Sequence, residues 1–411
     1  MITRVRNGEV YDPVAGAFLG ERTVVMEDDL IVDVTDGPVP EADVDLDARG
    51  RFVLPGFIDA HVHHVFPTMD FSRAARMSVV ELSISMAHLA HATLQRGFTT
   101  VRDTGGNVAG LVAAIESGLT PGPRIVCAGR IISQTGGHGD LRPGAVPLPS
   151  CGCQIATDRG EHAHIADGAD AVRKAARHEL RSGSAFLKIM TSGGVASPTD
   201  PFDSVQFTGE EIRAITVEAE HRHTYVTAHA YSPESIRLAV DHGVRCIEHG
   251  NMLDDATAAH LAQSGVTVVP TLVTYLAMQE MGAKVGLPTV SQEKNAGVFD
   301  AGRRAVEVAR AAGVELGFGT DLLGEAQPGQ NRELAIRAEL EPAADVLASM
   351  YVTNARLCGL EGRVGVVAPG AYADLVVVDV DPLENLAALA EPDFHLDAIV
   401  QGGRLIRDRL S

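Results

Sequence analysis

Aromatic residues are scarce in this chain. Among 411 residues there is no tryptophan, and aromatic side chains make up only 4%. Sites that stack bases or sugars need several aromatic rings, so a site of that kind is not expected. Positively charged residues are also few. The chain has 34 Lys and Arg but 54 Asp and Glu, which gives a formal net charge of −20. An acidic surface repels phosphate groups, which excludes nucleic acid and anionic membranes as expected partners.

Disulfide, membrane and secretion signals are missing as well. The five cysteines are an odd number, so we expect a cytoplasmic protein with ordinary thiols, Cys151 and Cys153 included. No stretch approaches 18 consecutive apolar residues, so no membrane span is expected, and the first residues lack the apolar core of a signal peptide. The motifs of serine hydrolases, zinc proteases with His-Glu-x-x-His and phosphate-binding loops are absent too.

The composition is that of a folded protein, since 45% of the residues are hydrophobic and 21% are charged. Both chain ends alternate like short β-strands. A hairpin is predicted around Asp28-Asp29, a strand over 374–379 and a second hairpin over 398–406. We therefore expect one small discontinuous β-sandwich domain made of residues 1–57 and 359–411.

The middle of the chain, residues 58–358, alternates short apolar runs with longer amphipathic stretches. Eight strand–helix units over about 300 residues are what a (β/α)₈ TIM barrel requires. A doubly wound open sheet is the alternative, which the lack of a Gly-x-Gly-x-x-Gly turn disfavours. The eight apolar runs are 56–61, 98–103, 124–128, 185–190, 225–230, 246–250, 266–271 and 315–321.

In such a barrel the chemistry lies at the C-terminal ends of the strands. Those ends carry four histidines, one lysine and one aspartate, which converge on one site: His61, His63, Lys188, His229, His249 and Asp321. His61 and His63 face the same way because a strand has a period of two, so His64 is expected to be structural. His162 and His164 have the same spacing, but they are interpreted as solvated residues of a polar loop.

Two of these residues allow more than one interpretation. A buried Lys188 must be paired or neutral, so it forms either an ion pair across the barrel or, after reaction with CO₂, a carbamate. Asp321 could cap the next helix, but beside four histidines it is better interpreted as a metal ligand and general base. The imidazole and carboxylate ligands favour Zn²⁺, with manganese, cobalt and iron as alternatives.

Together these motifs resemble the amidohydrolase superfamily. The matching features are Pro55-Gly-Phe-Ile-Asp-Ala-His-Val-His, Lys188, His229, His249 and Gly319-Thr-Asp321. Finer features, such as Gly136-Gly-His-Gly-Asp and His229-Ala-Tyr, are similar to the branch of metal-dependent prolidases, Xaa-Arg carboxypeptidases and ochratoxin-type amide hydrolases.

The resemblance implies a binuclear site. His61, His63 and Asp321 would hold one divalent ion, and His229 and His249 the second, with carboxylated Lys188 and a hydroxide bridging them. Asp321 would be the general base and acid, while His138 and Tyr231 would hold or polarise the substrate. Arg102 is expected either to meet a substrate carboxylate or to pair with Asp103.

The implied activity is hydrolysis of an amide bond, with a dipeptide or N-acyl amino acid as the substrate. A hydrolase of a cyclic amide, urea or carbamate, like imidazolonepropionase, is the alternative, and a barrel that binds without catalysis would need a broken ligand set. The segments 133–165, 192–208 and 276–297 are expected to line the barrel mouth and select the substrate. A homo-oligomer is also expected.

Overall fold

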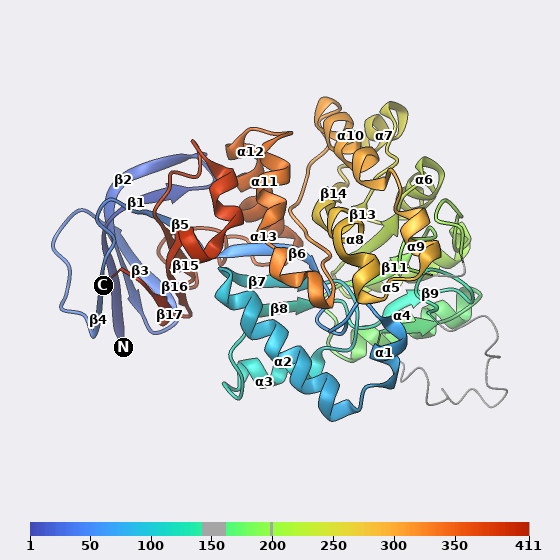
Figure 1. Cartoon of the computed structure of the whole chain (residues 1–411), viewed down its shortest axis with the longest axis horizontal. Coiled ribbons are helices and arrows are strands. Elements are labelled where there is room, and N and C mark those ends of the chain that lie inside the picture. The colour runs from blue at the N-terminus through green and yellow to red at the C-terminus, as the bar shows by residue number, and fades with distance from the viewer. Residues whose placement is uncertain (142–161, 198–199, 411) are drawn as a thin grey trace.

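The computed structural model describes residues 1–141, 162–197 and 200–410. The two ends of the chain form a β-sandwich, and the middle forms a parallel α/β core (Figure 1). The N-terminal and C-terminal strands lie together at the left of Figure 1, while the core fills the rest of the view. This arrangement confirms the α/β fold class and the sandwich made from both chain ends.

The sandwich strands within the described residues run in the order β17-β16-β15-β5-β1-β2-β3, with β4 paired to β1. Both expected hairpins are present, since β2 pairs with β3 and β16 with β17, each antiparallel. The strand β5 joins the two chain ends, because it pairs with β1 on one side and β15 on the other. The strands are β1 (Ile2–Asp12), β2 (Ala17–Glu27), β3 (Leu30–Thr35), β4 (Val44–Asp47), β5 (Phe52–Pro55), β15 (Leu375–Val378), β16 (Leu396–Gln401) and β17 (Arg404–Asp408).

The strand β15 shows how the sandwich meets the barrel. All four of its residues are buried, which explains its continuous apolar sequence. Val377 packs into the core of the sandwich with Val24, whereas Val376 belongs to a second cluster that includes Phe57 and Phe318 of the barrel. The limits at residues 57 and 359 stay a prediction.

The barrel strands form two parallel sheets, β6-β7-β8 and β10-β9-β11-β12-β13-β14. A backbone hydrogen bond of 2.9 Å from Ala185 to Cys127 links the third and fourth predicted runs. The strands are β6 (Phe57–Val62), β7 (Phe98–Asp103), β8 (Arg124–Cys127), β9 (Ile131–Ser133), β10 (Ala163–Ile165), β11 (Leu187–Met190), β12 (Val226–Ala230), β13 (Cys246–His249) and β14 (Thr267–Val269).

The eighth predicted run closes the barrel although it forms only an isolated bridge, between Leu316 and Val268. On its other side the N–H of Ala60 in β6 donates to the Phe318 carbonyl at 2.9 Å. Each of the eight predicted runs therefore takes its expected place around a TIM barrel.

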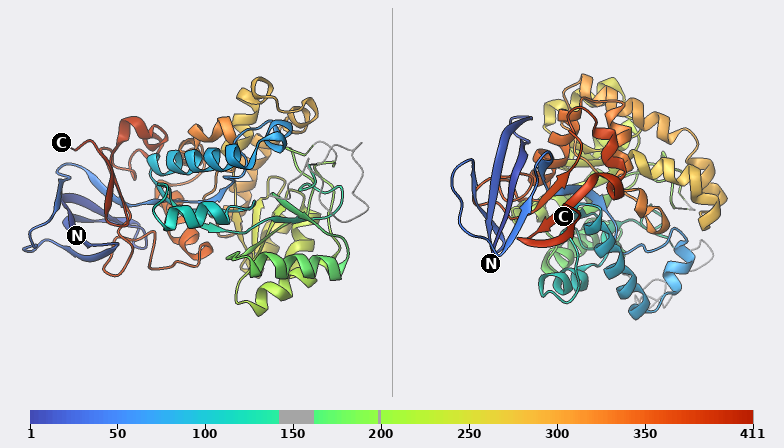
Figure 2. Two further views of the ribbon diagram at one scale, coloured as in Figure 1. Left: turned by 90° about the horizontal axis from the view of Figure 1, so that it is seen from below. Right: turned by 60° about the vertical axis from the view of Figure 1, so that its left-hand side comes forward.

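Helices cover the outside of the barrel, and the sandwich stands to one side of it (Figure 2). Some of them begin with a side-chain cap, such as the capping box of Thr208 and Glu211. None of the helices in the described part of the chain is long and apolar enough to cross a membrane. The helices are α1 (Phe71–Arg76), α2 (Val79–Gln95), α3 (Ala109–Glu116), α4 (Ala169–Arg181), α5 (Gly209–His221), α6 (Pro233–Asp241), α7 (Asp255–Ser264), α8 (Leu272–Val285), α9 (Thr289–Lys294), α10 (Val298–Ala311), α11 (Arg332–Ala338), α12 (Ala343–Ala348), α13 (Asn354–Leu357) and α14 (Pro392–His395).

Candidate active site

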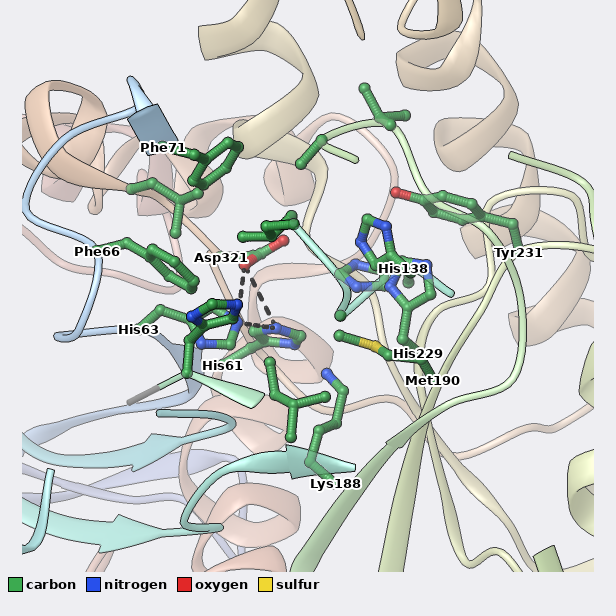
Figure 3. Close-up of a pocket in the computed structure, with 18 of the residues that line it drawn as sticks. His61, His63, Phe66, Phe71, His138, Lys188, Met190, His229, Tyr231 and Asp321 are labelled. Atoms are coloured by element: carbon green, nitrogen blue, oxygen red, sulfur yellow. Dashed lines mark hydrogen bonds and ion pairs between the residues drawn. The ribbon is translucent and has the colours of Figure 1, made fainter. Parts of the chain in front are cut away.

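One cavity collects the residues that the sequence singles out. Its empty space is about 650 Å³ when the open solvent at its mouth is included, and Figure 3 shows side chains from several barrel strands and loops directed into it. The three segments expected at the barrel mouth contribute Leu141, Val195 and Met278 to its wall. The sequence-predicted residues that line it are His61, His63, His138, Lys188, His229, Tyr231, His249 and Asp321.

Three of these side chains bring their ligand atoms together. The Nε2 atoms of His61 and His63 are 3.3 Å apart, and each lies 3.4 Å from Oδ1 of Asp321 (Figure 3). The ligand atoms of His61, His249 and Asp321 also lie within 4.8 Å of one another. The strand pair and the eighth run therefore form one compact group of nitrogen and oxygen donors.

The other nitrogen of each ring defines the form of the two histidines. Nδ1 of His63 lies 2.8 Å from the carbonyl oxygen of Gly105, which only accepts, so Nδ1 carries the hydrogen. Nδ1 of His61 lies 2.7 Å from the carboxylate of Glu248 and donates to it in the same way. Burial lowers the pKa of His63 to about 4 and that of His61 well below its ordinary value. Both rings are therefore neutral, and their Nε2 lone pairs face Asp321.

This arrangement fits a divalent cation. Two nitrogen lone pairs and a carboxylate oxygen repel one another unless positive charge lies between them. Ligands placed about 2.0–2.1 Å from one zinc ion in a tetrahedron are about 3.3–3.4 Å apart. The observed separations of 3.3 and 3.4 Å match that spacing. The donor set is thus suited to a metal without rearrangement.

His229 and His249 face this group from β12 and β13. Nε2 of His229 donates to the carbonyl oxygen of Gly193 at 3.0 Å, which leaves Nδ1 as its lone-pair atom. Nδ1 of His249 lies 2.8 Å from the Thr271 hydroxyl. Burial lowers the pKa of both rings well below the ordinary value. Both rings are therefore also neutral, with a lone pair available for a metal, and their ring centres are 4.7 Å apart.

Lys188 lies on β11 at the base of the cavity, with its amine directed toward the histidines (Figure 3). The residue is 1% exposed, and burial lowers the pKa of its ammonium although Glu248 and Asp321 oppose the shift. The Glu248 carboxylate is itself paired with Arg102 at 2.5 Å. A lowered pKa favours the neutral amine, which is the form that reacts with CO₂.

Asp321 is positioned by buried polar groups beneath it. Its N–H donates to the His61 carbonyl at 2.8 Å. The Asp59 carboxylate accepts the Thr320 hydroxyl at 2.6 Å and the His61 N–H at 2.9 Å. Asp321 has a φ of 51° and His249 a φ of 73°, a left-handed conformation that non-glycine residues adopt mainly under constraint. Burial raises the pKa of Asp321 to about 7.

His138 and Tyr231 lie on the wall of the same cavity. The His138 ring stacks on His229, with ring centres 4.2 Å apart, and burial lowers its pKa to about 4. The Tyr231 ring meets His229 edge-on at 4.7 Å, and its hydroxyl lies 2.9 Å from that of Tyr275. Tyr275 is a pocket residue that the sequence reasoning missed, because it stands on α8, beyond the end of a strand.

Glu248 and Arg102 are buried supports of the site. Glu248 contacts His61, the Thr227 hydroxyl and Arg102. Arg102 also donates to the Ala60 carbonyl at 2.6 Å. The expected pairing of Arg102 with Asp103 is not the one observed, because Arg102 pairs with Glu248. Asp103 instead accepts from His64, whose Nδ1 lies 2.9 Å away, as a structural role for His64 predicts.

The interpretation of His162 and His164 as solvated loop residues is wrong. His164 belongs to β10, is partly buried and has Nδ1 3.3 Å from Glu179. His162 lines the cavity, and its ring centre is 5.8 Å from that of Phe66. Only three residues form the strand, too few to give an alternating signal. Cys151 and Cys153 lie outside the described residues.

Comparison with known proteins gives the same family. The amidohydrolase family model matches residues 52–406. A prolidase crystallised with N-methylphosphonate-L-proline superimposes with a TM-score of 0.95 at 44% identity, over 99% of this chain and 100% of the other. A Xaa-Pro dipeptidase with methionine bound in its active site gives a TM-score of 0.85 at 28% identity, over 98% and 99%. Ochratoxinase of Aspergillus niger is 28% identical over 369 residues, 87% of this chain and 76% of its own. The chain therefore belongs to the amidohydrolase family.

Proposed function

We propose that this protein is a metal-dependent hydrolase that cleaves an amide bond in a dipeptide or N-acyl amino acid. The observation that carries the proposal is the convergence of neutral His61 and His63 on Asp321 at 3.3 and 3.4 Å inside one cavity. Relatives described as a prolidase and a Xaa-Pro dipeptidase support the substrate class.

In this proposal the ligands divide into two sets. His61, His63 and Asp321 would hold one divalent ion, zinc by preference, and His229 and His249 would hold the second. Lys188, carboxylated by CO₂, joins the two sets from the base of the cavity. Bound divalent ions supply Lewis acidity and a water ligand whose pKa is lowered toward neutral.

The chain's own groups would move the proton and stabilise the developing charge. Asp321 takes a proton from the attacking water and delivers it to the leaving nitrogen. Tyr231 points its hydroxyl across the pocket mouth as a donor to the oxyanion, and burial keeps it protonated by raising its pKa. His138, neutral and stacked on His229, orients the substrate.

The apolar residues of the cavity wall favour a substrate with an apolar side chain next to the bond that is cleaved. Phe66, Phe71 and Leu323 form an apolar part of the wall, and the Phe66 ring meets that of His63 edge-on with ring centres 5.9 Å apart. A substrate with an apolar side chain would remove this surface from water on binding.

One observation favours the second candidate, a hydrolase of a cyclic amide, urea or carbamate. Lys188 is the one Lys or Arg among the described residues of the cavity wall, and the proposal uses it to bridge the two metal sites. A dipeptide or N-acyl amino acid carries an α-carboxylate, which a cationic side chain would bind, whereas a cyclic amide needs no such partner.

The test is a substrate screen with the zinc-loaded protein. We expect hydrolysis of apolar dipeptides and N-acyl amino acids, and loss of activity when the C-terminal carboxylate is amidated. Turnover of cyclic amides or ureas alone would replace the first candidate with the second. Elemental analysis should find two metals per chain in the native protein and fewer in Lys188→Ala, and one or none in the native protein would contradict the bridging role of Lys188.

A further inference from the structure

A short segment that follows β11 contacts two histidines of the pocket. The Gly193 carbonyl accepts the Nε2–H of His229 at 3.0 Å, and the Ser197 hydroxyl lies 2.7 Å from Nδ1 of His138. Gly194 packs against the His138 ring so closely that a Cβ at this position would lie 2.0 Å from a ring carbon. The position of this segment, residues 193–197 together with Asp200 and called the β11 loop below, therefore sets the orientation of both rings.

Lys294, the last residue of α9, binds the backbone of the β11 loop. Its ammonium donates to the carbonyl oxygens of Gly194 at 3.1 Å, Ser197 at 2.7 Å and Asp200 at 2.5 Å. These three acceptors satisfy all three N–H donors of an ammonium. The side chain is partly buried, so the bonds are partly shielded from competing water.

Further contacts strengthen the same attachment. The Ser291 hydroxyl on α9 lies 3.2 Å from the Ala196 carbonyl oxygen and donates to it. The Asp200 carboxylate accepts the Gly194 N–H at 3.1 Å and lies 3.9 Å from Nδ1 of His138. The loop is therefore held both by donors from α9 and by the Asp200 carboxylate, which belongs to the loop itself.

We propose that Lys294 is a positioning residue, which fixes the His138 and His229 rings by gathering three carbonyl oxygens of the β11 loop. Lys294 does not line the cavity, so its hydrogen bonds act on the two rings through the loop, in addition to its charge, which contributes to the lowered pKa of His138. The inference rests on the proposed function, because the orientation of these rings affects turnover only if the pocket is hydrolytic.

The first test compares Lys294→Met with Lys294→Arg and with Lys284→Met. Lys284 is an exposed lysine on α8 and is the matched control. Loss of a group that orients a ligand typically costs about 10–100-fold in activity or metal affinity. We expect Lys294→Met to lower kcat by about 10-fold or more, Lys294→Arg to recover part of it by donating to the same carbonyls, and Lys284→Met to match the native enzyme.

A double-mutant cycle tests the route of the effect. Ser197→Ala removes the hydroxyl that contacts His138. If Lys294 acts through the β11 loop, Lys294→Met should cost less in the Ser197→Ala background than in the native protein, since coupled residues are not additive. Full additivity with unchanged loop exchange would overturn the inference.

Hydrogen exchange gives a readout that does not depend on activity. In the zinc-loaded protein, Lys294→Met should speed amide exchange of the peptide containing Gly193 to Ser197, while Lys284→Met should not. Unchanged exchange overturns the positioning role whatever the activity. Faster exchange in a protein that hydrolyses none of the screened compounds supports the positioning role and rejects the proposed function.

Discussion

The two sides of the pocket are held in different ways. On the first side, His61, His63 and Asp321 stand on barrel strands or in the run that closes the barrel, and buried groups such as Asp59 tie them together. On the second side, His138 and the ring of His229, whose backbone lies on β12, contact the β11 loop, which a lysine from a distant helix holds in place. The strand side is fixed by the register of the barrel, and the loop side by contacts between distant segments.

The two sides should therefore differ in how far they tolerate the loss of a single contact. Parallel strands fix side-chain positions through many backbone hydrogen bonds, so one lost contact moves them little. Loops vary more readily, because fewer bonds hold them. We therefore expect the strand side to set the chemistry and the loop side to adjust the substrate.

The largest effect is expected on the strand side, from Asp321→Asn. Asn keeps the size of the side chain but does not accept the proton, so kcat should fall by about 10³-fold, as for the loss of a general base. Circular dichroism should show an unchanged fold, and metal analysis should show most of the metal retained. Turnover within 10-fold of the native enzyme would contradict the proton-transfer role.

The next effect is expected on the loop side, from Tyr231→Phe. Loss of an oxyanion donor costs about 10²-fold in kcat, with KM little changed. Tyr275→Phe is the matched control, since it removes only the hydroxyl 2.9 Å away and should cost much less. Equal losses in the two variants would assign the effect to packing between the tyrosines instead of oxyanion binding.

Glu248→Gln tests the support beneath the strand side. The amide leaves Arg102 without its buried counter-charge and weakens the acceptor of His61, so metal affinity should fall about 10–100-fold. Stability in urea should drop by about 3 kcal/mol, as for a broken buried ion pair. Glu218→Gln, which breaks an ion pair with Arg177 outside the pocket, should leave metal affinity unchanged, and a similar loss in both variants would contradict the specific support of His61.

The smallest effect is expected at the start of α8, the helix that carries Tyr275 of the cavity wall. Glu333 on α11 accepts the Val273 N–H at 2.7 Å and so anchors the start of α8, and burial raises its pKa from 4.5 to about 8. The folded state therefore keeps a proton that the unfolded chain releases, and stability should fall as pH rises from about 4.5 to about 8.

Glu333→Gln should flatten this dependence in urea unfolding at several pH values. Glu307→Gln, at an exposed position on α10, should keep the native slope. A native profile that rises over the same pH range relative to Glu333→Gln would show that Glu333 is ionised in the folded protein.

The sequence predicted the strand side well, because a strand has a simple period. The pair His61 and His63 could be assigned to one face from spacing alone. The same rule fails at the end of β13, where Glu248 and His249 are consecutive and yet both contact pocket groups. The φ of 73° at His249 breaks the alternation of the strand. The residue type gives no sign of this conformation, because histidine has no strong preference for it.

The supports and the loop side were less predictable. Arg102 pairs with Glu248 from another strand, a contact that appears only when the barrel closes. Lys294 contacts Gly194, 100 positions away in the chain, and its own sequence context resembles an ordinary helix end. Such contacts depend on the packing of whole segments, which local patterns do not encode.

The place of β5 in the sandwich has a consequence for biosynthesis. Its partner on one side, β1, precedes it, but β15 on the other side is made only after the whole barrel sequence. Pairings between such distant segments form slowly because a long loop must close first. In an emerging chain one edge of β5 is therefore unpaired until β15 has been made, and an unpaired strand edge favours association with other chains.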